Sequence, residues 1–362
     1  MQKETYNVIG VMSGTSLDGI DLAHIHFSKV DGIWSFAILE TETVSYSIDW
    51  LNKLKIAVDF SEDELKVLNK DYTKLLGQII STFIAKYNIE NLDAVCSHGH
   101  TILHQPQNGF TLQIGNLPEI AAIVGETVVC NFRLQDVQLG GQGAPLVPIG
   151  DRILFSEFDY CLNLGGFSNV SFEQNGNRIA FDISPVNTVL NYYAHKLGLD
   201  YDDKGEIARS GQLNTDLLFQ LNGLDYYKKS FPKSLGFEFV KEIILPIIET
   251  YVIPTEDKMR TFTEHIAQQT ALALDCFASC LATSRNCKLL ATGGGTYNYF
   301  LMERMRFYLP KLEIIIPDKK TIEFKEALIF ALLGVLKLRN EINVLSSVTG
   351  AKHDHSSGKI FK

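Results

Sequence analysis

Gly10-Val11-Met12-Ser13-Gly14-Thr15-Ser16-Leu17-Asp18-Gly19 is the stretch that decides how the rest of this sequence is interpreted. Apolar, strand-like runs flank it at residues 6–12 and 21–27, so it joins the two strands of a β-hairpin. Glycine lets the backbone approach an anion closely, and successive N–H groups in such a turn form an anion-binding nest. A turn chosen for its conformation alone needs only one or two such residues. We therefore predict that this loop binds phosphate.

The loop combines hydrogen-bond donors with acids. We predict nucleotide contacts from Ser13, Gly14, Thr15, Ser16, Leu17, Asp18, Gly19 and Asp21. No lysine follows the last glycine, so this is not the Walker pattern. The carboxylates of Asp18 and Asp21 would repel a phosphate directly. We therefore predict that both act toward Mg²⁺, through its water ligands.

Length and composition indicate a globular protein with two domains. A chain of 362 residues is too long for one compact core, and its 46% hydrophobic and 21% charged residues are ordinary for a folded protein. The formal net charge of −9 argues against a nucleic-acid partner, because a phosphate backbone requires a field of lysine and arginine. No apolar window is long enough to span a membrane and no secretory leader is recognisable, so we expect a cytoplasmic protein without a membrane partner.

The six cysteines form no Cys-x-x-Cys pair and lie in apolar runs. We expect buried, reduced thiols rather than a disulfide framework or a zinc site.

Strand and helix patterns alternate along the chain. Strand patterns occupy residues 7–12, 21–27, 34–45, 93–97, 110–114, 127–130, 160–164, 169–173, 178–183 and 288–292, and helical patterns occupy residues 49–58, 62–87, 187–197, 237–248, 262–284, 298–309 and 327–338. The glycine-rich run at residues 140–145 is the clearest interruption, and we place the domain junction there. The predicted domains are residues 1–139 with 327–362, and residues 140–326.

Two later glycine turns are candidates for the same ligand. Gly165 and Gly166 open the second half of the chain with another hairpin, where Asn169 follows; nucleotide binding and a plain hairpin turn are equally good interpretations. Gly293, Gly294 and Gly295 follow an apolar strand and precede a helix, as dinucleotide-binding turns do. No acid lies at the Rossmann distance, so a site for adenosine or its ribose fits better.

Two acids occupy positions typical of catalytic groups. Asp182 ends a strand, where catalytic carboxylates collect, although a role as turn former or helix cap is nearly as good an interpretation. Glu326 lies in the first turn of a helix that is apolar on nearly every face, where the helix N-terminus alone could explain it. His98 and His100 share one side of an extended segment, and we predict hydrogen bonding rather than metal binding. His353-Asp354-His355 is interpreted as a polar loop.

Taken together, these motifs resemble those of the 1,6-anhydro-N-acetylmuramic acid kinases, members of the actin-like, sugar-kinase and Hsp70 superfamily. The resemblance covers almost the whole chain. It rests on the order and spacing of residues 10–21, 97–99, 115–116, 131–133, 136, 140–148, 163–169, 181–182, 185, 187, 232–234, 292–295, 298, 326–327 and 347–351.

The resemblance implies an α/β protein with two actin-like (ribonuclease H-like) domains, with nucleotide and sugar meeting in the cleft between them. It implies that ATP and water open the 1,6-anhydro bridge while O6 is phosphorylated, giving N-acetylmuramic acid 6-phosphate in peptidoglycan recycling. Asp182 would be the base that deprotonates the water. ATP and Mg²⁺ would be the cofactors, and a homodimer is expected.

The resemblance also implies a sugar site formed by His98, Thr101, Arg133, Asp136 and Glu326. Arg133 suits a carboxylate such as the lactyl group of the sugar. The chain departs from the family pattern at Ser184 and Val186, where glycine is common, and at His100, where glutamine is usual. Both departures put substrate detail in question more than reaction type.

Three alternatives stay open at this point. One is the same chemistry on another anhydrosugar such as levoglucosan, and another is simple phosphorylation of a hexose. The third is a nucleotide-gated binding protein in the manner of actin or Hsp70. Against it, the chain has no recognisable peptide-binding domain or filament surface, and Asp182 and Glu326 would have no obvious purpose.

Overall fold

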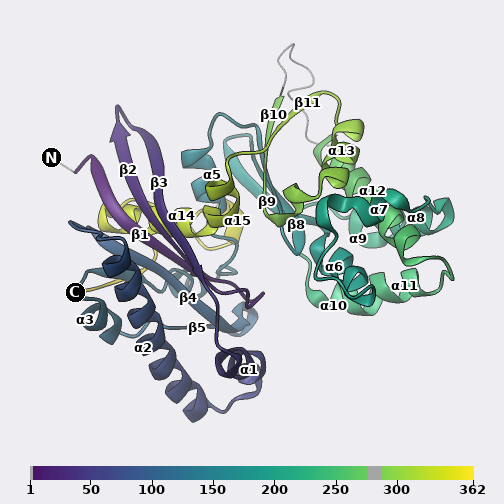
Figure 1. Ribbon diagram of the computed structural model, residues 1–362. Helices are drawn as coiled ribbons and strands as arrows, with labels where there is room; N and C mark the ends of the chain where they lie inside the picture. The colour runs from purple at the N-terminus through teal and green to yellow at the C-terminus, as the bar shows by residue number, and fades with distance from the viewer. Residues whose placement is uncertain (1–2, 276–286) are drawn as a thin grey trace. The chain divides into compact units, whose positions relative to one another are not determined.

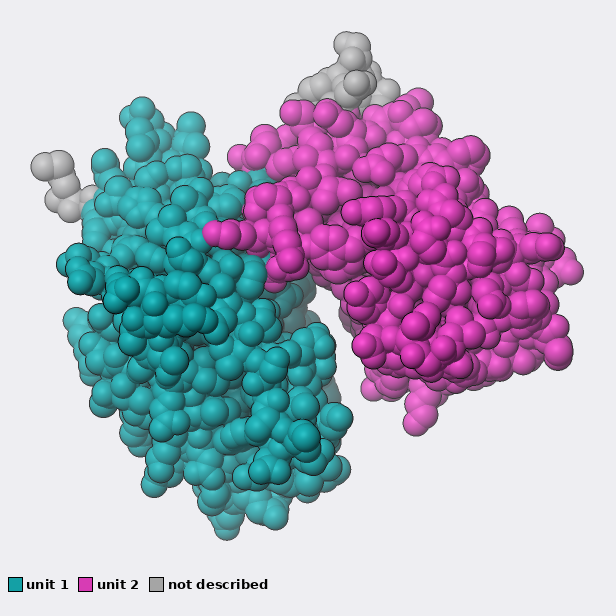
Figure 2. Space-filling view, viewed as in Figure 1, with its two compact units in different colours: residues 1–155, 324–362 teal, residues 156–323 magenta. Residues whose placement is uncertain are grey.

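The computed structural model describes residues 3–275 and 287–362 and divides the chain into two compact units (Figures 1 and 2). Unit 1 contains Met1–Phe155 and Phe324–Lys362, and unit 2 contains Ser156–Glu323. The division differs from the predicted junction at residue 140. Residues 140–155 stay with unit 1 because their helix packs on its long C-terminal helix, where a Cβ on Gly150 would lie 2.6 Å from the side chain of Ile329.

Unit 1 is built on one mixed sheet. Strands β1, β2 and β3 form an antiparallel meander, and β4 and β6 extend it as parallel strands on the β1 side. The full order is β12-β6-β4-β1-β2-β3, with β5 paired to β4. The strands are β1 (Thr5–Ser13), β2 (Ile20–Val30), β3 (Ile33–Val44), β4 (Ala94–Gln105), β5 (Phe110–Ile114), β6 (Val128–Cys130) and β12 (Lys359–Phe361). The last strand pairs antiparallel with β6, so the end of the chain completes the sheet that its beginning starts.

Unit 2 repeats this topology on a smaller sheet. Its order is β11-β10-β7-β8-β9, again a three-stranded meander extended by two parallel strands. The strands are β7 (Tyr160–Leu164), β8 (Phe167–Gln174), β9 (Asn177–Pro185), β10 (Cys287–Thr292) and β11 (Leu312–Ile315). Two α/β units with the same strand order are what the resemblance to actin-like proteins predicts, and the predicted fold class is confirmed.

The helices of unit 1 are α1 (Ile48–Ile56), α2 (Glu62–Lys86), α3 (Glu119–Val124), α4 (Leu134–Gln138), α5 (Pro148–Leu154), α15 (Ser346–Thr349) and most of α14 (Lys319–Leu338). A capping box between Ser61 and Glu64 begins α2. Helix α14 is buried along almost its whole apolar length, as its composition predicts. Its backbone packs so closely on β1 that only glycine fits at position 10: a Cβ there would lie 2.0 Å from the carbonyl oxygen of Ala327.

The helices of unit 2 are α6 (Asn187–Lys196), α7 (Glu206–Ser210), α8 (Thr215–Asn222), α9 (Asp225–Lys228), α10 (Phe237–Phe239), α11 (Leu245–Glu249), α12 (Thr255–Asp275) and α13 (Tyr299–Tyr308). The helix predicted over residues 237–248 is interrupted by a π-helical turn, Val240–Ile244, just before Pro246. Proline has no N–H to continue the α-helical pattern, which accounts for the irregular turn. Helix α12 begins seven residues earlier than predicted, and residues 276–284 of the predicted helix lie outside the described residues.

Cys96, Cys130 and Cys161 are buried free thiols, as predicted. Cys287 is disulfide-bonded, so the prediction of a reduced thiol is wrong there. Cys276 and Cys280 lie outside the described residues. Within residues 3–275 and 287–362, no helix combines the length and apolar character needed to cross a membrane.

Candidate functional site

The predicted phosphate loop closes the β1–β2 hairpin in unit 1. Ser13 pairs with Ile20 at the end of the hairpin, and residues 14–19 form the turn between them. The N–H of Leu17 donates to the carbonyl of Gly14 over 3.2 Å, with Leu17 itself at φ 62°. The side chains of Thr15, Ser16 and Asp18 are exposed. The loop therefore presents hydroxyls and a carboxylate to solvent, where a ligand can reach them.

Ser13 is the loop residue whose side chain faces inward. Its hydroxyl lies 2.6 Å from the hydroxyl of Tyr46 and 2.8 Å from Nδ1 of His100, and the Tyr46 hydroxyl lies 2.6 Å from that of Tyr72. Burial lowers the pKa of His100 to about 4, so this ring is neutral near pH 7. The Ser13 side chain thus supports the base of the loop rather than offering a free donor to phosphate, and His100 is part of that support.

The two acids of the loop fit an indirect contact with a divalent cation. Asp18 is exposed, whereas Asp21 is half-buried and accepts a hydrogen bond from Oγ1 of Thr43 over 2.6 Å. Across the described ranges, no group of three or more histidine, cysteine or acidic side chains is arranged to hold a metal by itself. A cation at Asp18 and Asp21 would therefore need further ligands, which the nucleotide phosphates and water can provide.

Arg133 and His98 form the centre of the predicted sugar site. Arg133 precedes α4, and its Nε donates to Nε2 of His98 over 2.7 Å while its Nη1 donates to the carbonyl of Gly143 over 2.7 Å. Nδ1 of His98 lies 2.9 Å from the carbonyl of Gly99, so Nδ1 carries the proton and Nε2 is the acceptor. Burial and the nearby Arg133 charge hold the pKa of His98 well below its usual range. His98 is a neutral ring that orients Arg133.

Glu326 shares the electrostatic environment of Arg133. Enclosure by surrounding protein atoms raises the pKa of the Glu326 carboxyl, the Arg133 charge opposes this shift, and the charge of Asp21 adds to it. Burial lowers the pKa of Arg133 to about 10, so the guanidinium stays charged at neutral pH. Many protein atoms lie around the Glu326 carboxyl, but part of its side chain is exposed to solvent. The charges of Arg133 and Asp21, both far from Glu326 in sequence, therefore act on the Glu326 carboxyl.

Thr101 and Asp136 occupy different surroundings. Thr101 is half-buried on β4, where Oγ1 accepts from Nε2 of Gln113 over 3.4 Å. Asp136 is completely buried, and its carboxylate accepts hydrogen bonds from the N–H of Gly143 and the hydroxyl of Thr349. Because both of its carboxylate oxygens accept hydrogen bonds from buried groups of the protein, Asp136 does not reach a sugar directly in this structure.

A row of polar residues crosses the sheet of unit 2. Thr292 on β10 pairs with Asn163 on β7, Asn163 pairs with Asn169 on β8, and Asn169 pairs with Asp182 on β9. The register of β8 and β9 shifts beside Asn169, so β9 bulges next to Asp182. Bulges commonly re-aim a side chain beside an active site. Paired residues in neighbouring strands share one face of the sheet, so the row places Asn163, Asn169 and Asp182 together.

Asp182 is fixed by the segment that follows α9. The N–H of Leu235 donates to Oδ2 of Asp182 over 2.8 Å, and the hydroxyl of Tyr226 donates to the Asp182 carbonyl over 2.6 Å. Its other carboxylate oxygen accepts no hydrogen bond from the residues that the structure describes. Burial raises the pKa of Asp182, and the hydrogen bond from Leu235 opposes that rise. One oxygen is therefore anchored while the other is available to accept a proton.

The departure from the family pattern at Ser184 is accommodated within the sheet. The side chain of Ser184 is completely buried, its N–H donates to Oγ of Ser168 over 3.1 Å, and Oγ of Ser168 donates to the Ser184 carbonyl over 3.1 Å. These bonds hold the end of β9 against β8 and leave Asp182 in its row.

The two later glycine turns lie beside the end of β7. The carbonyls of Gly165 and Gly166 accept from the N–H groups of Asn187 and Val186, over 3.2 and 2.8 Å, at the start of α6. Gly293 adopts φ 84°, and a Cβ there would lie 2.6 Å from Oδ1 of Asn163. Only glycine permits this approach. Both turns therefore meet around Asn163 and the start of α6.

A cavity of about 450 Å³ opens next to these turns. Its lining includes Asn187 and Asn191 of α6, Tyr201, and Gly294 and Tyr297 of the third glycine turn. The volume is in the range of small-molecule sites, and its aromatic and amide groups suit a nucleoside. The sequence predicted Gly294 but not Asn191 or Tyr201, because only the fold brings residues from α6 and the loop after it to the same place.

A family model and curated relatives both match this chain over nearly its whole length. A family model described as anhydro-N-acetylmuramic acid kinase matches residues 6–362. Proteins with that description are 32% identical in Shewanella putrefaciens, with 98% of each chain covered, and 32% identical in Actinobacillus pleuropneumoniae serotype 3, with 100% of each covered. The corresponding protein of Pasteurella multocida is 33% identical, covering 100% of this chain and 98% of its own.

Similarity to solved structures is more distant. The activator of 2-hydroxyisocaproyl-CoA dehydratase from Clostridium difficile with bound ADPNP is 15% identical, with a TM-score of 0.40 and coverage of 92% of this chain and 96% of the activator. Hexokinase from Schistosoma mansoni complexed with glucose is 10% identical, with a TM-score of 0.38 and coverage of 91% and 85%.

Proposed function

The chain belongs to the anhydro-N-acetylmuramic acid kinase family, and we infer from this membership that it phosphorylates 1,6-anhydro-N-acetylmuramic acid with ATP in cell-wall recycling. The family match and the relatives both extend over essentially the whole chain, so the activity concerns both units together. In this reaction water adds to the anomeric carbon, and the bond between that carbon and the bridging oxygen breaks. That oxygen takes the γ-phosphoryl group as O6, ADP leaves, and the product is N-acetylmuramic acid 6-phosphate.

The observation that carries the mechanism is the environment of Asp182. We propose that its unbound carboxylate oxygen accepts a proton from the attacking water. The oxygen held by the N–H of Leu235 fixes the direction in which the group points. Burial raises its pKa, so the ionised carboxylate is a stronger base than that of an exposed aspartate. The amides of Asn163 and Asn169 lie in the same row and provide polar groups that can orient the water.

Arg133 is the proposed contact for the lactyl carboxylate. Two of its N–H groups are used within the protein, on His98 and Gly143. Its remaining N–H groups, on Nη1 and Nη2, have no hydrogen-bond partner among the described residues, so this edge of the guanidinium can donate to a carboxylate. We propose that Glu326 and Thr101 hydrogen-bond the hydroxyl and amide groups of the same sugar.

The nucleotide is proposed to use the three glycine turns. The exposed loop at residues 14–19 would hold phosphates, and the cavity beside Gly294 would hold the adenosine. Asp18 and Asp21 would hold Mg²⁺ through water, and the cation would neutralise charge on the transferring phosphoryl group. On this proposal unit 1 carries the phosphate loop and the sugar residues, and unit 2 carries the base and the adenosine cavity. A cytoplasmic homodimer stays a prediction from the sequence, which light scattering can test for the oligomeric state.

Substrate comparison and labelled water test the proposed function. With ATP and the anhydro-muramic sugar in H₂¹⁸O, we expect one ¹⁸O at the anomeric carbon and phosphate on O6, with much weaker turnover of levoglucosan and glucose. Equal or better turnover of levoglucosan would favour another anhydrosugar as substrate, and phosphorylation without label would favour an ordinary hexose kinase. ATP hydrolysis that needs no sugar would favour a nucleotide-gated binding protein instead.

A further inference from the structure

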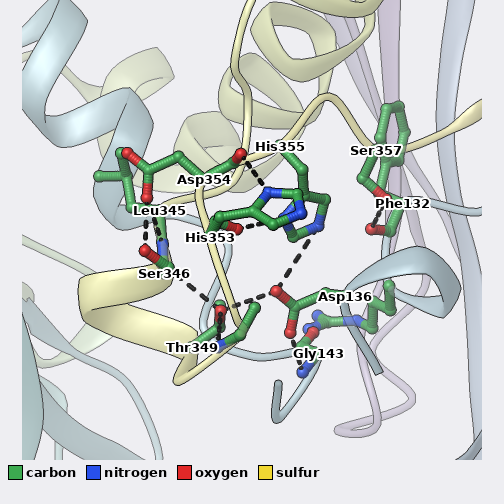
Figure 3. Close-up of polar contacts among 12 residues, drawn as sticks. Phe132, Asp136, Gly143, Leu345, Ser346, Thr349, His353, Asp354, His355 and Ser357 are labelled. Carbon is green, nitrogen blue, oxygen red and sulfur yellow. Dashed lines mark hydrogen bonds and ion pairs between the residues drawn. The ribbon is translucent and has the colours of Figure 1, made fainter. Parts of the chain in front are cut away.

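A buried polar cluster in unit 1 connects the C-terminal segment to the predicted sugar site (Figure 3). Its centre is Asp136 on α4, with no exposed surface. Oδ2 of Asp136 accepts the N–H of Gly143 over 2.6 Å, and Oδ1 accepts the hydroxyl of Thr349 over 2.7 Å. Nε2 of His355 lies 3.6 Å from the same Oδ1. Asp136 thus joins the loop at Gly143 to the C-terminal segment that contains Thr349 and His355.

The backbone holds His355 in place independently of this contact. His355 and Val344 form an isolated antiparallel bridge, with N–H to carbonyl distances of 3.1 and 3.2 Å. The neighbouring Asp354 accepts from both the N–H and the hydroxyl of Ser346, each over 2.7 Å. The side chain of His355 is almost completely buried. Its ring is therefore directed at Asp136 by a fixed main chain.

The two ring nitrogens of His355 have different surroundings, which determine how the ring interacts with Asp136. Nδ1 lies 3.1 Å from the carbonyl of His353, which can only accept, so Nδ1 carries a proton. Nε2 is buried without a hydrogen-bond partner among the described residues. Without a proton, Nε2 would direct a lone pair at a carboxylate, acceptor against acceptor. With a proton it forms a buried ion pair with Asp136, which is the charged group that faces it.

Gly143 transmits this arrangement to Arg133. The N–H of Gly143 is held by Asp136, and the carbonyl of Gly143 accepts from Nη1 of Arg133 over 2.7 Å. The loop has room for this only because of its glycines: a Cβ on Gly141 would lie 2.2 Å from Oδ2 of Asp136, and Gly143 itself adopts φ 67°. The loop is also fixed to the C-terminal segment, since the N–H of Gln142 donates to the Thr349 carbonyl over 2.8 Å.

We propose that His355 is a positioning residue for substrate recognition: by pairing with Asp136 it fixes the Gly143 carbonyl, and through it the Arg133 guanidinium that binds the carboxylate of the sugar. This proposal rests on the proposed role of Arg133. It gives the polar loop at residues 353–355 a function, and it assigns Asp136 to the support of the sugar site instead of to the sugar itself. His355 touches no substrate and acts only through the order of the loop.

The test compares two sugars in variants of the full chain. The probes are 1,6-anhydro-N-acetylmuramic acid and 1,6-anhydro-N-acetylglucosamine, which is the same sugar without the acidic lactyl group. For His355→Ala we expect KM for the acidic sugar to rise between about tenfold and about a hundredfold, because a displacement of about 1 Å is enough for such a loss. Binding of the non-acidic sugar, measured by calorimetry, and KM for ATP should stay unchanged. His355→Gln, whose amide can donate to Asp136, should restore most of the affinity.

Two further variants separate positioning from a general structural effect. In an Arg133→Ala background, His355→Ala should cause no further loss of affinity for the acidic sugar, because His355 acts on the sugar only through Arg133. His26→Gln, at an exposed histidine of β2, is the matched control and should behave as wild type. If His355→Ala does not fold, Thr349→Val removes a neighbouring donor to Asp136 and is measured in its place.

The proposal is overturned if KM for the acidic sugar is unchanged in the variant, if both sugars lose affinity equally, or if the losses of His355→Ala and Arg133→Ala add in full. Failure of the proposed function has a different signature, since the wild-type chain would then show no ATP-dependent turnover of the anhydro-muramic sugar at all.

Discussion

Asn169 faces Asp182 directly across the β8–β9 pair, at the point where β9 bulges. The neighbours of Asp182 along this row are amides, which carry no charge. Burial, and not repulsion by another carboxylate, is therefore what raises the pKa of Asp182. A carboxylate that is desolvated, anchored by one backbone N–H and flanked in its row by uncharged amides is suited to take a proton from water. Four predictions about the proposed mechanism and one about the fold follow from the structure.

Asp182→Asn should fold and bind ATP but lose turnover by about 10²- to 10⁴-fold, because asparagine cannot accept the proton. Since the folded protein disfavours the ionised carboxylate, the melting temperature should stay the same or rise at neutral pH. Steady-state kinetics and thermal unfolding measure both. Asp216→Asn, at an exposed position in the first turn of α8, is the matched control. Near-normal turnover in Asp182→Asn would remove Asp182 as the base.

The acid limb of the pH profile should report Asp182. The base works only when ionised, so kcat/KM for the sugar should fall as the pH drops through its pKa. Because burial raises that pKa, the midpoint should lie above the usual range of aspartate. Kinetics between pH 4 and pH 8 measure it, and the residual activity of Asp182→Asn should lack this limb. An identical limb in that variant would assign the titration to a different group.

Arg133→Ala should raise KM for the anhydro-muramic sugar by about ten- to a hundredfold, the range expected for losing hydrogen bonds to a charged group. Turnover of levoglucosan, which has no carboxylate, should change much less. Arg306→Ala, at an exposed arginine on α13, provides the control for loss of charge. An unchanged KM for the acidic sugar would show that Arg133 does not bind the carboxylate.

Gly14→Ala should leave the fold intact and weaken nucleotide binding. The atom nearest to an added Cβ would be the hydroxyl of Ser16 at 3.4 Å, which is an ordinary contact. If phosphate approaches the backbone of this loop, however, the methyl group should raise KM for ATP by about tenfold, equivalent to roughly 1.4 kcal/mol. Thermal unfolding and ATP kinetics measure the two effects. A variant with wild-type KM for ATP would count against close phosphate contact at Gly14.

Gly10→Ala should instead destabilise the fold. Its Cβ would lie 2.0 Å from the carbonyl oxygen of Ala327, so β1 and α14 would have to separate. Overpacking of this kind costs about 1–3 kcal/mol or more, and we expect the melting temperature to fall by roughly 5–10 °C. Gly223→Ala is the control, since it ends α8 with nothing closer than 3.3 Å. A melting temperature equal to that of wild type would show that α14 can move away from β1 with little loss of stability.

The sequence predicted the parts of this fold that depend on local signals. Helix α2 begins at the capping box of Ser61 and Glu64, and the apolar run of α14 is buried as expected. Strands β11 and β12 were not predicted, because three or four residues at a sheet edge show too little alternation to stand out. The π-helical turn before Pro246 was likewise not predicted, since the flanking residues favour an ordinary helix.

The candidate site was predictable as a set of residues but not as an arrangement. That Asn163, Asn169 and Asp182 form one row depends on strand register and on the bulge in β9, which sequence spacing does not reveal. The inward direction of the Ser13 hydroxyl depends on Tyr46 and His100, both distant in sequence. The burial of Asp136 could not be inferred either, because two of the groups that contact its carboxylate, Thr349 and His355, lie more than 200 residues away in the sequence.

Unit 1 is discontinuous, with its first 155 residues completed by residues 324–362. On the ribosome, this means that a nascent chain emerges with the β1–β3 meander long before α14 is available to cover it. Unit 2 is one continuous stretch and can fold as soon as it leaves the exit tunnel. We therefore expect the second unit to be completed first, and the phosphate loop and Arg133 to become ordered only after residues 324–362 have been synthesised.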